Sequence, residues 1–340
     1  MDHGLTQKER QCQSEKTLTS GMKFFKHQGI DKFMIQAPMS PFIPRYVRTA
    51  QTGVLKEKIR QAEALLSPCI LCPRQCRVDR ARDEKGYCGA GEKAMVASFA
   101  PHFGEEAPLV GDRGSGAFFF SHCNLKCVFC QNYEISIDGR GQAMEAEEVA
   151  YVMLYLQNMG CCNINLVTPT HVVPRILKAL DIAAGHGLRL PLVYNSSGYD
   201  RVETLKILRG VVDIYMPDFK FWETDAAGQF CHAKDYPNIA RKAVIEMQAQ
   251  VGDLLLDEEG LAVSGLLVRH LVMPGRISDT GRILEFLKQE VSAHTHVNLM
   301  SQYRPMCDAE NYKELSRPLS AEEFRKALHL GKASGLTLVR

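Results

Sequence analysis

Residues 117–130 read Ala-Phe-Phe-Phe-Ser-His-Cys-Asn-Leu-Lys-Cys-Val-Phe-Cys, an apolar run that leads directly into three closely spaced cysteines. The run is typical of a buried β-strand, and Cys123, Cys127 and Cys130 lie on the loop that follows it. Cysteine thiolates on such a loop hold iron–sulfur clusters, and a cubane usually takes four of them. Three ligands leave one iron open, and an open iron can bind a small molecule and pass it an electron.

Two other interpretations of this cysteine loop are a structural zinc site that borrows a distant fourth ligand and three unrelated core cysteines. The spacing, the aromatic Phe129 before the last cysteine and the position after a strand favour the cluster. Because ligands collect at the carboxyl ends of parallel strands, the loop also marks the expected active site.

The chain around and beyond the loop alternates between short apolar stretches and amphipathic stretches. We expect strands at 117–121, 163–167, 191–195, 211–216, 265–272 and 297–300. We expect helices at 146–159, 173–184, 202–208, 240–251 and 280–291, and a last helix that opens with Ser320 and Glu323 at capping-box spacing. This rhythm predicts an α/β fold with parallel strands and right-handed crossovers. Six strand–helix units favour a barrel or part-barrel, although a doubly wound open sheet gives a similar pattern.

The composition describes a globular protein without an obvious polyanionic partner. The chain has 340 residues, 45% hydrophobic and 24% charged, with a formal net charge of +2. This balance predicts no nucleic-acid partner through bulk electrostatics. No apolar run approaches the roughly 18 residues of a membrane span, and residues 1–30 lack the apolar core of a secretory signal. We therefore expect a cytoplasmic protein that does not bind membranes.

A second cysteine group precedes the strand–helix region. Cys69, Cys72, Cys76 and Cys88 have the short spacings of a closed structural zinc site or of an iron–sulfur cluster, and the choice between the two metals stays open. Such a small module needs a bound metal to organise it. The expected divisions are a loosely ordered extension at 1–45, a helix with the four-cysteine module at 46–92, a connecting segment at 93–116 and the barrel at 117–340.

The cysteine loop resembles the signature of radical S-adenosylmethionine (SAM) enzymes, and within them of proteins related to pyruvate formate-lyase activating enzyme. The resemblance extends over roughly residues 45–336. Five more segments carry it: HFGEE at 102–106, CQNYEIS at 130–136, NINLVTPTH at 163–171, LVYNSSGY at 192–199 and DIYMPDFK at 213–220. It includes the four-cysteine group but does not settle its metal. The resemblance implies a partial (β/α)6 barrel.

The resemblance also implies the chemistry. A [4Fe–4S] cluster on Cys123, Cys127 and Cys130 chelates the methionine amino and carboxylate groups of SAM through its open iron. An electron from an external donor of the flavodoxin or ferredoxin type then leads to a 5′-deoxyadenosyl radical, which removes hydrogen from a substrate. The implied target is a glycine in a partner enzyme. Because a shared fold does not transfer a substrate, modification of a peptide and rearrangement of a small molecule stay open.

Polar residues at the later strand ends are the candidates for holding SAM. Many family members carry Gly-Gly-Glu after the second strand, where this chain has Thr168-Pro-Thr170 instead, so that hydroxyl or carbonyl oxygens replace the expected carboxylate. Asn195 and Ser197 suit ribose hydroxyls or the SAM carboxylate. The remaining candidates are Asp218 and Lys220, which resemble the Asp-x-Lys of activases, and Arg269 on the fifth strand.

Two further hypotheses come from other classes of protein. An iron–sulfur lyase that uses the open iron as a Lewis acid predicts turnover without SAM or reductant. A non-catalytic metal carrier or scaffold predicts no SAM binding. Glu105 and Glu106, just ahead of the first strand, are placed where they could meet a substrate amine, but we expect them to lie in a solvated turn. Cys231 has no partner at ligand spacing.

Overall fold

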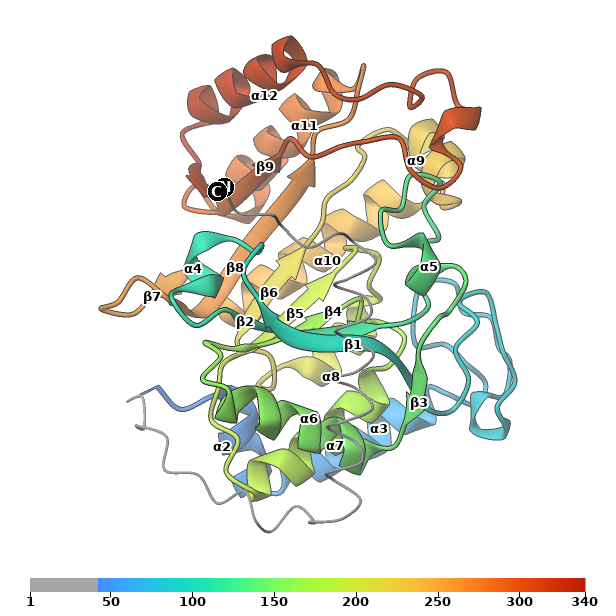
Figure 1. The fold of residues 1–340 in the computed structure, drawn as a ribbon, viewed down its shortest axis with the longest axis vertical. Coiled ribbons are helices and arrows are strands. Elements are labelled where there is room, and N and C mark those ends of the chain that lie inside the picture. The colour runs from blue at the N-terminus through green and yellow to red at the C-terminus, as the bar shows by residue number, and fades with distance from the viewer. Residues whose placement is uncertain (1–41, 340) are drawn as a thin grey trace, which may run out of the picture.

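The computed structural model of the protein describes residues 42–339 (Figure 1). The expected extension at 1–45 therefore lies outside the described residues up to position 41. Among residues 42–339, no helix is both long enough and apolar enough to cross a lipid bilayer.

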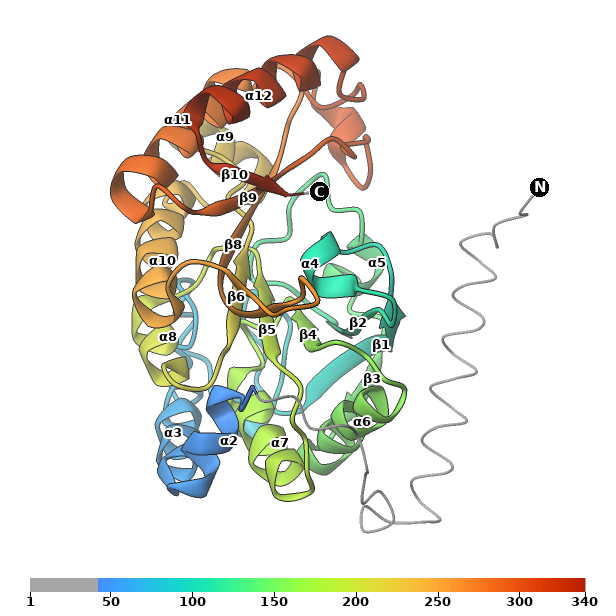
Figure 2. The same ribbon diagram turned by 90° about the vertical axis from the view of Figure 1, so that its left-hand side faces the viewer.

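The core of the fold is a ten-stranded sheet with the order β10-β9-β8-β6-β5-β4-β2-β1-β3, in which β7 adds to β8. Its parallel strands are β2 (Ser115–Phe120), β4 (Ile164–Val167), β5 (Leu192–Ser196), β6 (Ile214–Pro217), β8 (Ala262–Leu271), β9 (His296–Met300) and β10 (Thr337–Val339). The first six are the six predicted strands, whereas β10 was not predicted. The sheet is curved, as in a part-barrel (Figure 2).

The expected connecting segment at 93–116 contributes a strand to the sheet. It contains β1 (Ala94–His102), which pairs antiparallel with β2 and with β3 (Gln142–Met144). The alternation of small, apolar and polar residues in β1 buries Ala94, Val96 and Phe99 against the core. A short β7 (Leu255–Leu256) at the start of β8 was also not predicted.

Helices cover the outer face of the sheet (Figure 2). They are α6 (Ala146–Asn158), α7 (Val173–Gly185), α8 (Val202–Leu208), α9 (Thr224–Cys231), α10 (Tyr236–Val251), α11 (Ile277–Phe286) and α12 (Ala321–Ser334). All of the predicted helices are present, whereas α9 was not predicted. The capping box at the start of α12 is confirmed, because the Ser320 hydroxyl accepts the Glu323 N–H and the Glu323 carboxylate accepts the Ser320 N–H.

A one-turn helix, α4 (Ala107–Val110), lies in the opening of the curved sheet between β2 and β8 (Figure 2). Its Leu109 is fully buried and packs with an apolar cluster from the inner face of the sheet, Val193, Ile214, Met216 and Leu267. The side chain of Asn163 donates to the Leu109 carbonyl at 2.8 Å. This insertion brings the residues just before α4 into the interior of the barrel.

The N-terminal region packs on the outside of the barrel and extends to the end of the barrel where the cysteine loop lies. Helices α2 (Arg45–Gln51) and α3 (Val54–Ala64) lie against α7, and α3 also lies against α8. The four-cysteine segment follows them without regular helix apart from the single turn Arg80–Arg82. It packs on the cysteine loop that follows β2.

Candidate active site

The loop with Cys123, Cys127 and Cys130 leaves the carboxyl end of β2, as the sequence predicted. Its centre is fixed by backbone hydrogen bonds, since the Val128 N–H donates to the Phe230 carbonyl at 3.0 Å and the Val128 carbonyl accepts the Asp308 N–H at 2.9 Å. The bends next to the cysteines adopt the left-handed backbone region, at Lys126 for example with φ 59°. That conformation is rare for a residue with a side chain and persists where the surroundings hold it.

The three thiols are at least half-buried. Cys127 is buried, with its Sγ 3.3 Å from Sγ of Cys231, while Cys130 Sγ lies 3.1 Å from the Ser136 hydroxyl. The hydrogen bond to Cys231 and burial raise the pKa of the Cys127 thiol well above its usual value. Burial likewise raises the pKa of Cys130, to about 12, and that of Cys123. Thiolate is the form that binds iron, so binding of a metal must displace the protons of these thiols.

The thiols of Cys123, Cys127 and Cys130 suit an iron–sulfur cluster that the protein binds through three of its four irons. No three His, Cys, Asp or Glu side chains within residues 42–339 converge in the way that a single bound metal ion requires. In a cubane each thiolate binds a different iron, so its three sulfurs stand apart from one another. The Cys123 sulfur already accepts the Leu125 N–H at 3.4 Å, a hydrogen bond that stabilises a thiolate. The loop residues thus fit a [4Fe–4S] cluster.

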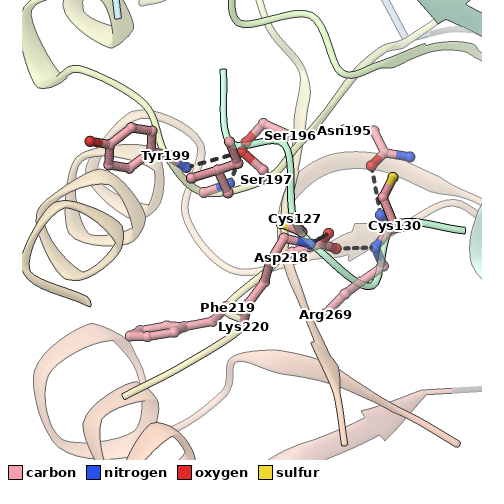
Figure 3. A network of polar contacts seen from close by, with 12 residues as sticks. Cys127, Cys130, Asn195, Ser196, Ser197, Tyr199, Asp218, Phe219, Lys220 and Arg269 are labelled. Atoms are coloured by element: carbon pink, nitrogen blue, oxygen red, sulfur yellow. Dashed lines mark hydrogen bonds and ion pairs between the residues drawn. The ribbon is translucent and has the colours of Figure 1, made fainter. Parts of the chain in front are cut away.

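A charged network lies at the ends of the neighbouring strands (Figure 3). Asp218, just after β6, accepts from Lys220 Nζ at 2.6 Å and from Arg269 Nε at 2.9 Å. Arg269, on β8, also donates to Oδ1 of Asn195 at 2.7 Å. Four of the seven predicted SAM-binding residues therefore meet in one hydrogen-bonded group.

The charges in this network are matched to one another. Burial alone raises the pKa of the Asp218 carboxyl, but Arg269 and Lys220 outweigh burial and hold that pKa below its usual range. Burial opposes the charge on Lys220, and Asp218 more than compensates, so the pKa of Lys220 is raised. The Lys220 ammonium also favours ionisation of the Cys123 and Cys127 thiols. The network and the cysteine loop are thus electrostatically coupled.

Thr168, Thr170 and Ser197 are the three other residues predicted to bind SAM, and their side chains are not hydrogen-bonded to the charged network. The Thr170 hydroxyl donates to Oδ1 of the buried Asp200 at 2.7 Å and is occupied there. Thr168 has a left-handed backbone with φ 59°, and its N–H donates to the Asn195 carbonyl at 2.9 Å. The Ser197 carbonyl accepts from the Tyr236 hydroxyl at 3.0 Å, while its own hydroxyl accepts only a long bond of 3.4 Å from the Tyr199 N–H. Their contacts with SAM stay predictions.

Gly198 lets the loop after β5 approach Asp218. Its φ is +74°, and a Cβ placed on it would lie 2.3 Å from the Asp218 carbonyl oxygen. No residue with a side chain fits at that distance, so the glycine is needed for the contact between the ends of β5 and β6.

Glu105 and Glu106 are not in a solvated turn, and that prediction was wrong. Both precede α4, the side chain of Glu105 is 9% exposed and Glu106 is 3% exposed. Glu105 Oε2 lies 3.4 Å from Arg269 Nη1, and Glu106 Oε1 accepts from Asn298 Nδ2 at 2.8 Å. The insertion of α4 into the barrel carries these carboxylates inside, and neither charge nor hydropathy patterns reveal such an insertion.

The second cysteine group shares two features with the cysteine loop: backbone N–H groups donate to its sulfur atoms, and burial raises the pKa of its thiols. Backbone N–H groups donate to its sulfurs, from Tyr87 to Cys76 at 3.2 Å and from Ala90 to Cys88 at 3.4 Å. Burial raises the pKa of Cys72 to about 12 and also that of Cys88. These four thiols lie outside the barrel, and within residues 42–339 they too do not converge in the way that a single bound metal ion requires, so a metal here stays a prediction.

This second group contacts the cysteine loop directly. Arg74 donates through Nε to the Asn124 carbonyl at 2.8 Å and stacks on the Tyr87 ring, with its guanidinium 3.9 Å from the ring centre. The Tyr87 hydroxyl donates to the Leu125 carbonyl at 2.9 Å. The two cysteine groups are therefore held together by hydrogen bonds to the backbone of the cysteine loop.

Comparison with known proteins identifies the family. The Radical SAM superfamily matches residues 118–287. An uncharacterized protein of Methanocaldococcus jannaschii is 32% identical over 297 residues, which cover 84% of this chain and 81% of that protein.

Solved structures with a similar fold include SuiB of Streptococcus suis bound to S-adenosylmethionine, with a TM-score of 0.45 and 11% identity over 64% of this chain. SuiB bound to its precursor peptide SuiA gives a TM-score of 0.43 at 10% identity. The chain spans about half the length of SuiB, 47% and 46% in the two structures. The family match begins in β2 and includes the cysteine loop and the strand ends that carry the charged network. This chain belongs to the radical SAM superfamily, a family of enzymes that use a [4Fe–4S] cluster and S-adenosylmethionine.

Proposed function

We propose that this enzyme binds a [4Fe–4S] cluster through Cys123, Cys127 and Cys130, cleaves SAM reductively there and removes hydrogen from a substrate. The observation that carries the proposal is the hydrogen-bonded charged group at the ends of β5, β6 and β8, which lies beside the cysteine loop (Figure 3). When bound, the cluster and SAM supply the 5′-deoxyadenosyl radical, and the protein positions them and excludes water and oxygen.

In this proposal the chain's own residues bind and orient SAM. Lys220 and Arg269 present the positive charge that a carboxylate needs, and Asp218 holds both cations at the strand ends. Asn195 and Ser197 follow β5 and offer hydrogen bonds to ribose hydroxyls. Thr168 and Thr170 take the place of the Gly-Gly-Glu segment that contacts the amino group in many relatives.

The finer proposal is an activase-like hydrogen abstraction from a glycine in a partner enzyme, with a peptide as the second target. The similarity of Asp218-Phe219-Lys220 to the Asp-x-Lys of glycyl-radical activases supports the first target. A one-electron donor of the flavodoxin or ferredoxin type completes the reaction. A cytoplasmic setting suits such an oxygen-sensitive cluster.

We also infer that Cys69, Cys72, Cys76 and Cys88 bind a second metal, as zinc or as an iron–sulfur cluster. The N–H···S hydrogen bonds at Cys76 and Cys88 support this inference, because they stabilise thiolate ligands. A cluster there relays electrons or binds substrate, whereas zinc serves as scaffold.

The test is anaerobic reconstitution with iron and sulfide, followed by addition of reductant and SAM and chromatography for 5′-deoxyadenosine. The wild type and Cys161→Ala, which changes a buried cysteine outside both groups, should form it, and Cys127→Ala should not. Turnover of a substrate without SAM or reductant supports the Lewis-acid lyase instead. A reconstituted protein that binds no SAM supports the scaffold.

A further inference from the structure

The charged network and the two glutamates next to it, Glu105 and Glu106, together carry more negative than positive charge. The carboxylates are Glu105, Glu106 and Asp218, and the cations are Arg269 and Lys220. Asp218 is paired with both cations, and Glu105 lies 3.4 Å from Arg269. Within residues 42–339 no cationic group lies at ion-pair distance from Glu106, and Arg269 attracts its carboxylate only from farther away. Buried carboxylates of this kind call for a positive partner.

We propose that Glu106, with Glu105 and Asn165, binds a cationic nitrogen of the substrate, a protonated amine, inside the barrel. This inference rests on the proposed function, because it names the substrate class of the same active site.

The first support is the set of unused acceptors. Glu106 is 3% exposed, its Oε1 accepts from Asn298, and its Oε2 has no hydrogen-bond partner. Asn165 is fully buried, and neither its Oδ1 nor its Nδ2 has a partner. A buried polar atom without a partner costs about 1–3 kcal/mol. An ammonium has three donors and no acceptor, which suits Oε2 of Glu106, Oδ1 of Asn165 and a carboxylate oxygen of Glu105.

The second support is that Asn165 faces the interior where these carboxylates lie. Asn163 and Asn165 are two residues apart, so their side chains leave the same face of β4. The Asn163 side chain binds the Leu109 carbonyl in α4, which occupies that interior. Asn165 also pairs in register with Val193, a member of the inner apolar cluster. Glu106 reaches the same space from the other side, since it immediately precedes α4.

The third support is that the carboxylates are continuous with the charged network. Arg269 joins Glu105 to Asn195 and Asp218, so the carboxylates continue the SAM-binding group without a break. The side chains of Glu105 and Arg269 keep 9% and 15% of their surface exposed. Burial and the neighbouring Glu106 carboxylate raise the pKa of Glu105 against the effect of Arg269, and a bound cation would relieve this unfavourable charge. The Asn195 Nδ2 is also unpartnered and is available to an acceptor on the same substrate.

The test measures binding of simple amines by the reconstituted enzyme with SAM present. The probe is n-butylammonium, with n-butanol and butyrate as neutral and anionic controls, and with 1,4-diaminobutane and Nα-acetyl-lysine methylamide to separate a free amine from a lysyl side chain. The variants are Glu106→Gln and Glu105→Gln, and the control is Glu322→Gln on the exposed surface of α12. At about 10 mM, butylammonium should raise the melting temperature of wild type and Glu322→Gln by about 2 °C and leave Glu106→Gln unchanged.

The outcomes separate this inference from the proposed function. No shift with any amine, or the same shift in wild type and both glutamine variants, overturns the inference even if SAM is cleaved. Weaker SAM binding in Glu106→Gln without an amine effect means that the sulfonium is the cation, and also overturns it. An amine shift that needs Glu106 in a protein that never cleaves SAM supports the site and defeats the proposed function. If Glu106→Gln does not fold, Glu105→Gln gives the same comparison with a weaker expected shift.

Discussion

The sulfur atoms of Cys127 and Cys231 lie 3.3 Å apart, although the two residues are 104 positions apart in the chain. Cys231 ends α9, which packs behind the cysteine loop, and it is fully buried. Once Cys127 is a metal-bound thiolate, the Cys231 thiol is placed to donate an S–H···S hydrogen bond to it. Hydrogen bonds to the sulfurs of an iron–sulfur cluster are one of the features that set its reduction potential.

Cys231→Ala should therefore lower the midpoint potential of the cluster while leaving it bound. Loss of a hydrogen bond of about 1 kcal/mol to a one-electron centre corresponds to a shift of roughly 40 mV. A redox titration followed by electron paramagnetic resonance measures it, with Cys161→Ala as the control. A variant with full iron content and an unchanged potential would show that this thiol does not donate to the cluster, and loss of iron would make Cys231 a ligand.

Arg269→Lys should weaken SAM binding by about tenfold, or roughly 1.4 kcal/mol, with unchanged iron content. Arg269 uses separate nitrogens to reach Asp218, Asn195 and Glu105, and a lysine ammonium cannot span the three. Equilibrium dialysis of SAM measures the change, and Arg282→Lys on the exposed face of α11 is the control. Equal affinities in all three proteins would contradict a role of Arg269 in holding SAM.

The metal of the second cysteine group is decided by elemental analysis of anaerobically purified protein. If the group holds a [4Fe–4S] cluster, iron should approach about eight atoms per chain and fall by about half in Cys72→Ala. If it holds zinc, about one zinc per chain should be present and Cys72→Ala should lose it. Four irons and no zinc in the wild type would contradict any metal at this group.

His171 should make the fold less stable in mild acid. Burial lowers its pKa to about 3, and one ring nitrogen lies 2.7 Å from the Ser121 carbonyl. The unfolded chain takes up a proton near the ordinary histidine pKa of about 6.5, whereas the folded protein does not. The stability contributed by the neutral ring is thus complete above about pH 6.5 and is lost as the pH falls, at up to roughly 1.4 kcal/mol per pH unit.

Between about pH 6.5 and 5.5, the wild type should lose about 1 kcal/mol more than His171→Gln, whose amide can still donate to Ser121. Urea unfolding at each pH provides the comparison, and His294→Gln at an exposed position is the control. Parallel pH curves for the wild type and His171→Gln would show that this ring does not limit the stability in acid.

Sequence periodicity was sufficient for the parallel sheet, because each of its first six strands is a short apolar run between amphipathic helices. β1 was not found, because it pairs antiparallel with β2 in a way that no crossover rule predicts. The cysteine loop was placed correctly at the end of β2, since its ligands are local in sequence. Asn195, Asp218, Lys220 and Arg269 were chosen for their positions at strand ends, and the curvature of the sheet brings them together.

The residues that sequence reasoning missed depend on contacts between distant segments. Cys231 becomes a neighbour of Cys127 only when α9 packs behind the loop. Glu105 and Glu106 look like a polar turn in the sequence, and they enter the barrel because Leu109 anchors α4 in its apolar interior. Asn165 alternates with apolar residues in β4, so nothing in its own strand marks it as unpartnered.

The central claim is that a cluster on Cys123, Cys127 and Cys130 cleaves SAM, and the most direct measurement is the yield of methionine and 5′-deoxyadenosine from the reduced, reconstituted protein. Equal amounts of the two products are expected from the wild type and none from Cys127→Ala. A fully loaded and reduced wild-type cluster that leaves SAM intact would contradict it.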